Sequence, residues 1–210
     1  TSLDGASASE RTGSDGAGLL NDYITTPVTE TVTTPDIIAT IDKARSSDTY
    51  GDTDADVRIG DIVEYTLTVS MPEGSLGNLQ LTDTLPQGLD FVGVVSINGN
   101  TGPAPYTAVA PFSHDDILDT DIVESGDPAT GSTTVSWNIG TLTNQHDDGA
   151  DNNFTIVYRA RVLNNVFDHA DLSIGLNNTV NMSYDTATGT ASDSDTDTDS
   201  DTDTDSDGDW

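Results

Sequence analysis

The sequence predicts an all-β fold, a sandwich or a barrel, with extended acidic segments at both ends. Short stretches alternate apolar and polar residues, and stretches rich in Gly, Pro, Asn and Asp separate them. Alternation of this kind, punctuated by turn residues, is typical of antiparallel sandwiches and barrels. The stretch HDDILDTDIVES is the only candidate for a helix. A chain of 210 residues has room for one full domain with extensions, or for two small domains.

Composition divides the chain into three regions. Residues 1–34 are rich in Gly, Ser, Thr and Asp and form a junction segment that ends in an extended strand. Residues 35–185 carry the alternating stretches and are the predicted sandwich domain. Residues 186–210 are a low-complexity linker in which aspartate occupies every odd position from Asp193 to Asp209. We call these nine aspartates the Asp comb, and we expect the linker to be disordered without a counter-ion.

Alternation also predicts which side chains are buried. In DIVEYTLTV and NFTIVYRARV every second residue is apolar or aromatic, so one face of each strand should point into the core. We expect seven to nine strands between residues 35 and 185, arranged in two sheets. The predicted core contains Val63, Tyr65, Leu67, Val69, Leu81, Leu85, Phe91, Trp137, Ile156, Tyr158, Val180 and Met182.

Charge and motif content exclude several classes of function. The chain has 37 acidic and 6 basic residues, a formal net charge of −31, which repels nucleic acid and anionic lipid. It has no cysteine, so disulfides and thiolate metal sites are excluded. Its three histidines lie in different segments, and no nucleophile, zinc-protease or phosphate-loop motif occurs. We therefore expect that the protein is not an enzyme.

One long stretch resembles a known family. IGDIVEYTLTVSMPEGSLGNLQLTDTLPQGLDFV, residues 59–92, resembles the conserved-repeat domain of bacterial and archaeal surface proteins, known as domain of unknown function eleven. The segments PDIIATIDK and NNTVNMSY extend the resemblance to about residues 35–185. It implies an immunoglobulin-like β-sandwich that occurs in tandem in very large exported proteins, and it implies no catalytic activity.

The last residues of the chain, followed by its first residues, form one continuous sequence pattern, SDGDW-TSLDGAS. The start, TSLDGASASERTGSDGAGLLNDY, resembles the segment that follows the last strand of one such domain and precedes the next, and the chain ends in GDW. We therefore expect one repeat unit of a longer protein, or a subunit whose ends meet in a polymer. The predicted partner is in both cases a copy of the same chain, arranged head to tail.

The regular spacing of the Asp comb predicts calcium binding. In an extended strand the alternating carboxylates lie on one side, about 6.6 Å apart, and repel one another unless cations separate them. Calcium prefers such oxygen ligands. The segment DTDTDSDGDW has the D-x-D-x-D-G spacing of half a calcium loop but lacks the distal glutamate. The alternative is a solvated spacer that self-repulsion keeps extended. The candidate ligands are Asp197, Asp199, Asp201, Asp203, Asp205, Asp207 and Asp209.

Two further acidic groups are candidates for completing calcium sites at a domain end. One is the stretch HDDGADNN, with Asp147, Asp148, Asp151 and Asn152, and the other is the stretch GDTDADVRIGD, with Asp52, Asp54, Asp56 and Asp61. Each is also compatible with an ordinary polar loop. At a head-to-tail junction we expect the neighbouring copy to supply part of the coordination through its opening residues, which include Asp4, Asp15, Asn21 and Asp22.

Lys43 is the only lysine in the chain. By strand parity it shares a face with core residues, and Asp83 and Asn178 also fall on inward faces. A buried lysine, carboxyl group and asparagine resemble the self-crosslinking domains of Gram-positive pilins, in which an unprotonated lysine attacks an asparagine amide. Burial lowers the pKa of a lysine and raises that of a carboxyl group, as this reaction needs. The alternatives are a Lys43–Asp83 ion pair, or a lysine that reaches solvent at a strand end.

These observations favour a structural repeat or subunit of an extracellular or cell-surface fibre, stalk or sheath, with calcium stiffening its head-to-tail junctions. One alternative is a ligand-binding adhesin module that uses the loop NGNTGPAPYTAVAPF. Another is a salt-adapted surface-layer domain without a specific metal. Three asparagines, Asn153, Asn177 and Asn181, match the N-x-[ST] glycosylation pattern, at a frequency that chance explains in so Asn- and Thr-rich a chain.

Overall fold

The computed structural model describes residues 37–47, 57, 59–146, 152–164, 175–186 and 189–200, with the side chains of Gly175 and residues 198–200 left out. The chain divides into two units, Thr1–Pro35 and Asp36–Trp210. The first unit lies outside the described residues, so the fold described below is that of the second.

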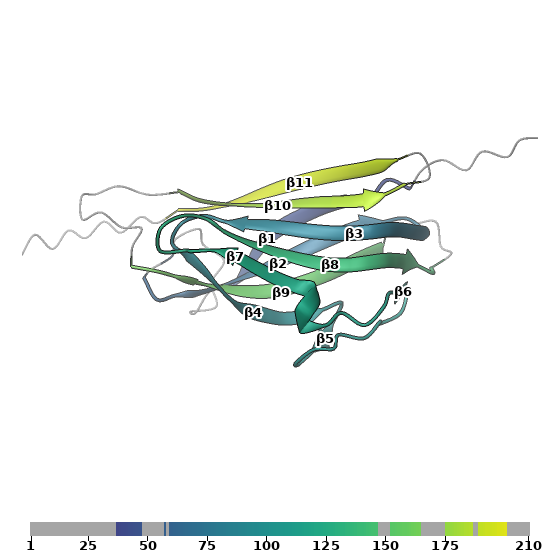
Figure 1. The fold of residues 1–210 in the computed structure, drawn as a ribbon, viewed down its shortest axis with the longest axis horizontal. Helices are drawn as coiled ribbons and strands as arrows, with labels where there is room; N and C mark the ends of the chain where they lie inside the picture. The colour runs from purple at the N-terminus through teal and green to yellow at the C-terminus, as the bar shows by residue number, and fades with distance from the viewer. Residues whose placement is uncertain are drawn as a thin grey trace, which may run out of the picture. The chain divides into compact units, whose positions relative to one another are not determined.

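Two antiparallel β-sheets pack face to face (Figure 1). One has the strand order β1-β2-β9-β4-β5, and the other the order β11-β10-β3-β8-β6, with β7 also paired to β8. The strands are β1 (Thr40–Ser47), β2 (Ile62–Met71), β3 (Gly74–Leu85), β4 (Leu89–Ile97), β5 (Asn100–Thr101), β6 (Phe112–Ser113), β7 (Ile122–Gly126), β8 (Thr133–Asn144), β9 (Asn152–Val162), β10 (Gly175–Asp185) and β11 (Thr190–Ser200).

The predicted core is confirmed almost residue for residue. Of the twelve predicted side chains, only Phe91 is partly rather than fully buried. The largest buried side chains are aromatic, and Trp137 and Tyr65 both pack on Tyr158, with ring centroids 5.4 Å apart in each pair. Since apolar burial is the main favourable term in folding, alternation along the strands is sufficient to select the inward faces.

Turns and helix content also follow the sequence. The motif DTLPQGL forms the end of β3, a turn and the start of β4, and Gly88 in that turn has φ of +96°, which favours glycine. The candidate helix reduces to a 3₁₀ turn over Asp119–Asp121. The described residues before 186 form ten strands, more than the seven to nine expected, because two of them have only two residues.

The final strand departs from the expectation. Composition places the end of the sandwich at residue 185 and predicts a linker beyond it, whereas β11 continues the sheet to Ser200 by pairing along the whole of β10. In β11 the aspartates alternate with outward serine and threonine, and Asp193, Asp195 and Asp197 are half-buried. Composition does not predict this strand, because the high charge of the segment suggests disorder, whereas pairing with β10 stabilises the extended backbone.

The Asp comb closes one edge of the sandwich. β1 and β11 are the edge strands of opposite sheets. The carboxylate Oδ2 atoms of Asp193, Asp195 and Asp197 accept hydrogen bonds from the backbone N–H groups of Ile41, Lys43 and Arg45, at 2.8, 2.7 and 2.7 Å. Both strands repeat every two residues, so successive aspartates of β11 meet successive outward N–H groups of β1 at these three positions. The carboxylates thereby occupy donors that an exposed edge strand would offer to another chain.

Candidate functional site

Four polar side chains meet in the interior between the two sheets. Lys43 on β1 and Tyr158 on β9 come from one sheet, and Asp83 on β3 and Asn178 on β10 come from the other. Lys43 is 4% exposed, and the other three are fully buried. The three side chains that the sequence singles out therefore lie together, on the inward faces that alternation predicts.

The hydroxyl group of Tyr158 lies at the centre of this cluster. It donates a hydrogen bond to Oδ2 of Asp83 at 2.6 Å. It accepts hydrogen bonds from Nζ of Lys43 and from Nδ2 of Asn178, each at 2.9 Å. The Lys43 ammonium group also lies 2.5 Å from Oδ2 of Asp83. Because both nitrogens bond to the same oxygen, Nζ of Lys43 and Nδ2 of Asn178 lie no further apart than twice 2.9 Å.

Two oxygen atoms of the cluster lack partners. Oδ1 of Asp83 and Oδ1 of Asn178 are buried and make no hydrogen bond of normal geometry. A buried acceptor without a donor costs roughly 1–3 kcal/mol. Apolar side chains of similar size in these positions would avoid this cost.

Burial changes the acidity of the cluster. Desolvation raises the pKa of the Asp83 carboxyl group above its ordinary value of 3.8, although the neighbouring Lys43 opposes this shift. Desolvation, followed by the nearby Asp83 charge, raises the pKa of Tyr158 well above 10. Both shifts favour the neutral forms, so transfer of a proton from the Lys43 ammonium to Asp83 would leave an uncharged cluster with an unprotonated amine.

The geometry distinguishes the two alternatives to a cross-link at Lys43, an ion pair with Asp83 and a side chain that reaches solvent. A lysine that reaches solvent is excluded, because its side chain has no exposed surface. An ion pair with Asp83 is present in the structure. The ring of Tyr65 lies 4.9 Å from Nζ and adds a cation–π contact while the amine is charged.

Sequence reasoning includes Tyr158 in the core but misses its role in this cluster. Alternation places its side chain on the inward face of β9, as it does for the apolar residues of that strand. Its position near Asp83 depends on the packing of the two sheets, which no local pattern reveals. The available signal was chemical, since a buried tyrosine hydroxyl nearly always finds a polar partner.

Most of the predicted calcium ligands lie outside the described residues. Asp197 accepts the hydrogen bond from the backbone N–H of Arg45. The side chain of Asp199 is not among those that the structure describes. Among the other candidates, Asp4, Asp15, Asn21, Asp22, Asp52, Asp54, Asp56, Asp147, Asp148, Asp151, Asp201, Asp203, Asp205, Asp207 and Asp209 lie outside the described residues. Within the described residues, no group of three or more His, Asp or Glu side chains is arranged to hold a metal ion.

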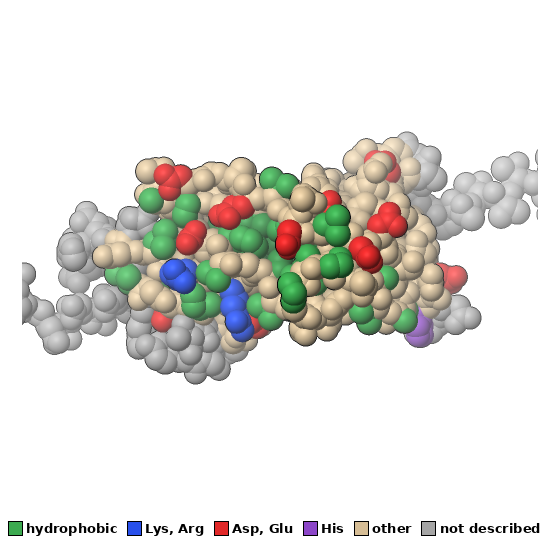
Figure 2. Space-filling model, turned by 60° about the horizontal axis from the view of Figure 1, so that its bottom comes forward, with side chains coloured by type: hydrophobic (Ala, Val, Ile, Leu, Met, Phe, Trp, Pro, Cys, Tyr) green, Lys and Arg blue, Asp and Glu red, His purple; other side chains and the backbone are tan. Residues whose placement is uncertain are grey.

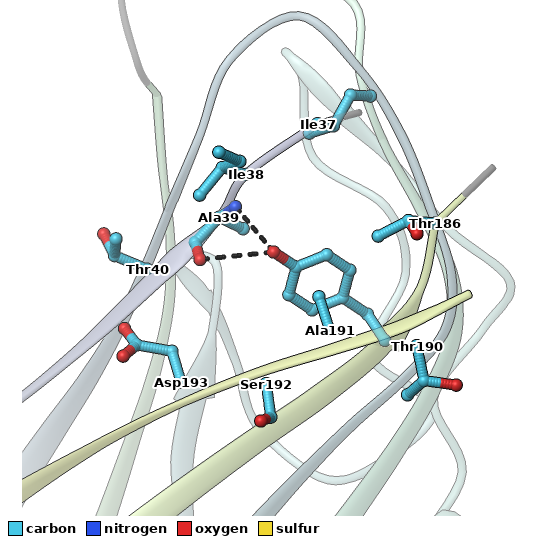
Figure 3. A pocket seen from close by; sticks show the side chains of 10 residues that line it. Ile37, Ile38, Ala39, Thr40, Thr186, Thr190, Ala191, Ser192 and Asp193 are labelled. Carbon is cyan, nitrogen blue, oxygen red and sulfur yellow. Dashed lines mark hydrogen bonds between the residues drawn. The ribbon is translucent and has the colours of Figure 1, made fainter. Parts of the chain in front are cut away.

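A hollow of about 390 Å³ opens beside the start of β1 (Figure 3). Ile37 and Ile38 line one side, and Ala191 lines the other. The Tyr184 hydroxyl group accepts a hydrogen bond from the Ala39 N–H at 2.9 Å, so this tyrosine connects β10 to the residue that precedes β1, as the comb connects β11 to β1 itself. The hollow is open to solvent, and the Ile38 side chain that lines it is 76% exposed.

The loop considered for ligand binding turns its aromatic residues inward. Tyr106 and Phe112 are each only 4% exposed, and Phe112 packs edge-to-face on Phe154 at 5.6 Å between ring centroids. On the face seen in Figure 2, acidic and hydrophobic side chains are scattered among polar groups. The loop therefore offers no aromatic platform for a ligand. Among the described residues, no helix has the length and apolarity needed to span a membrane.

Comparison with known proteins assigns no family. No family model matches the chain, and no curated protein matches it, so the resemblance to the conserved-repeat domain is not confirmed. Solved structures with a similar arrangement include three major pilins. SpaD of Corynebacterium diphtheriae matches at 17% identity and a TM-score of 0.44, over 76% of this chain and 34% of that chain.

The other two pilins are similarly distant. BcpA of Bacillus cereus matches at 15% identity and a TM-score of 0.46, over 79% of this chain and 41% of that one. GBS80 of Streptococcus agalactiae, as a C-terminal fragment, matches at 15% identity and a TM-score of 0.46, over 78% and 55%. The chain thus spans about a third to about half the length of these matches. Likeness at this level assigns neither a family nor a function.

Proposed function

We propose that this chain is a structural unit of an extracellular fibre, stalk or sheath, and that an amide bond between Lys43 and Asn178 locks its sandwich. The observation that carries the proposal is the buried cluster of Lys43, Asp83, Tyr158 and Asn178. It joins the first strand of the domain to the tenth, across the two sheets. A covalent bond there would enclose most of the domain in one loop.

The cluster holds the groups that such a reaction needs. Lys43 supplies an amine, Asn178 supplies an amide carbon, and Asp83 lies 2.5 Å from the amine and can take its proton. The neutral amine then attacks the amide carbon of Asn178, and ammonia leaves. The dry interior excludes water, which would otherwise compete as a nucleophile.

Mechanical load explains why a fibre would use this bond. Force that enters at one end of the domain would reach Lys43 on β1, cross to Asn178 on β10 and leave through the C-terminal side. Strands β2–β9 would then carry no tension. Without the bond, unfolding would release the chain between the two residues, about 450 Å at ~3.4 Å per residue.

The mass of the intact chain tests the proposal. The folded wild-type chain should be lighter than its sequence by one ammonia, and Lys43→Arg and Asn178→Ala should both have the full mass. Protease digestion should yield a branched peptide that joins the segments around residues 43 and 178. A folded wild-type chain with the full mass would overturn the proposed bond.

Single-molecule stretching tests the mechanical role. The wild-type domain should show no unfolding step under loads that unfold an ordinary sandwich, whereas Asn178→Ala should release roughly 450 Å of chain. A wild-type domain that lengthens as far as the variant would contradict a load-bearing function, even if the bond is present.

We also propose that calcium binds the distal part of the Asp comb, from residue 201 onward, and stiffens head-to-tail junctions between copies. The supporting observation is the D-x-D-x-D-G spacing of Asp203, Asp205, Asp207 and Gly208. Calcium should raise the unfolding temperature or protect this segment in the native assembly, and sodium at equal ionic strength should not. Equal effects of the two salts would indicate general screening, as the salt-adapted alternative requires.

A further inference from the structure

The hydroxyl group of Tyr158 makes three hydrogen bonds, which use all of its capacity. Its single proton goes to Oδ2 of Asp83 at 2.6 Å. Its two lone pairs accept from Nζ of Lys43 and Nδ2 of Asn178, both at 2.9 Å. These two nitrogens are the atoms that would exchange places on the amide carbon. The tyrosine therefore bridges the attacking and the leaving nitrogen.

The bridge also orients the amide of Asn178. Because Nδ2 donates to Tyr158, the amide cannot present its nitrogen to Asp83 without losing that bond. Its oxygen, Oδ1, is left buried without a donor. Oδ1 of Asp83 is also buried without a donor. If the Asp83 carboxyl group were protonated on this oxygen, Oδ1 would become a hydrogen-bond donor, and only Oδ1 of Asn178 would remain an unpaired acceptor.

We propose that Tyr158 is a catalytic residue of the cross-linking reaction, in which its hydroxyl group relays a proton from Nζ of Lys43 to the departing Nδ2 of Asn178. This inference rests on the proposed Lys43–Asn178 bond and extends it. The role is distinct from that of Asp83, which takes the first proton from the ammonium group.

Atoms and charges balance in the step. The uncharged Lys43 amine attacks the side-chain carbon of Asn178, so that one C–N bond forms and the bond to Nδ2 breaks. The attacking nitrogen loses one proton as it becomes an amide. The leaving nitrogen gains one proton and departs as ammonia. Tyr158 donates its proton to Nδ2 and regains one from Nζ, directly or through Asp83, so the tyrosine ends the step unchanged. Asp83 keeps the proton that it took from the ammonium group and ends as a neutral carboxyl group.

The first test compares the rate of ammonia loss in two variants of the full chain, each of which lacks one buried tyrosine hydroxyl group. Tyr158→Phe should slow the loss of ammonia by at least about a hundredfold, the lower end of the range for a proton-transfer group. The matched control is Tyr184→Phe, because this hydroxyl group also makes a buried hydrogen bond, from β10 to the backbone of Ala39 just before β1, but contacts none of the reacting atoms. The control should keep the wild-type rate. Freshly synthesised chains are followed by intact mass, with circular dichroism as the check on folding.

A second variant separates proton transfer from positioning. Site-specific replacement of Tyr158 by difluorotyrosine keeps the hydroxyl group in place but makes the phenol more acidic. A relay predicts a change in rate of about threefold or more, since general-acid rates follow acidity. A wild-type rate in this variant would overturn the relay, and so would a wild-type rate in Tyr158→Phe. If the wild-type chain itself keeps its ammonia, the proposed bond fails and the relay fails with it.

Discussion

The carboxylate of Asp195 accepts a hydrogen bond of 2.7 Å from the backbone N–H of Lys43. This contact connects the two unusual features of the chain, the Asp comb and the single lysine. The strand that carries the lysine is held against the C-terminal hairpin by side chains, where an ordinary sheet would use a backbone ladder. Asn178 lies on the other strand of that hairpin, opposite Asp197.

Replacement of Asp195 should loosen this edge. Asp195→Ala removes the acceptor for the Lys43 N–H and should lower the free energy of unfolding by about 1.5–3 kcal/mol, the usual contribution of a hydrogen bond to a charged group. Asp195→Asn keeps an acceptor oxygen and should recover much of this loss. Ser194→Ala, on the exposed face of the same strand, is the control. Denaturant unfolding in the Asn178→Ala background measures the effect, and equal stability of Asp195→Ala and the control would contradict it.

Removal of the last strand should unmask the edge of β1. In a chain truncated after Gly189, the amides of Ile41, Lys43 and Arg45 should exchange hydrogen much faster, because their acceptors are gone. The amides of Asp42 and Ala44 point the other way, toward β2, by strand alternation and should stay protected. The truncated chain should also self-associate through its open edge. Uniform loss of protection would instead mean that the whole domain is destabilised.

Loss of the cross-link should be visible in stability. By analogy with disulfides, closing a loop of more than 100 residues restricts the unfolded chain by about 5 kcal/mol. Asn178→Ala should lose that contribution and keep the Lys43–Asp83 ion pair. Lys43→Ala should be less stable still, because it also leaves the buried Asp83 without its cation. Denaturant midpoints rank the three chains, and a wild-type midpoint equal to that of Asn178→Ala would show that the bond adds nothing.

Acidity should affect the unlinked chain through Asp83. Burial raises the pKa of Asp83 in the folded state above the 3.8 expected for the unfolded chain, so the folded state holds this proton more tightly. Stability from this group is therefore fully present below about pH 3.8 and is lost as pH rises through the raised folded pKa. Asn178→Ala should show this decline relative to Asn178→Ala/Asp83→Asn, since the other acidic groups are common to both. Parallel stability curves for the two chains would contradict the prediction.

Local alternation was sufficient for most of the fold. In β2 and β9 every second side chain is apolar or aromatic, and a half-buried sheet permits only one placement of such a strand, so the sequence by itself determined the inward faces of Tyr65 and Tyr158. The same parity placed Lys43, Asp83 and Asn178 inside. Their neighbours could not be derived in this way, because the four side chains of the cluster meet through contacts between residues up to 115 positions apart.

Only the tertiary structure decided the hydrogen-bond partners of Tyr158 and of the Asp comb. The hydroxyl group of Tyr158 reaches Asp83 and Asn178 only because the two sheets pack with β9 opposite β3 and β10. The same holds for the Asp comb, whose regular spacing suggested a metal or a solvated spacer. From the sequence alone, aspartates at every second position predict only repulsion between like charges. In the fold, Asp193, Asp195 and Asp197 meet backbone N–H groups of β1 with the same two-residue period, and these donors offset the cost of bringing the carboxylates together.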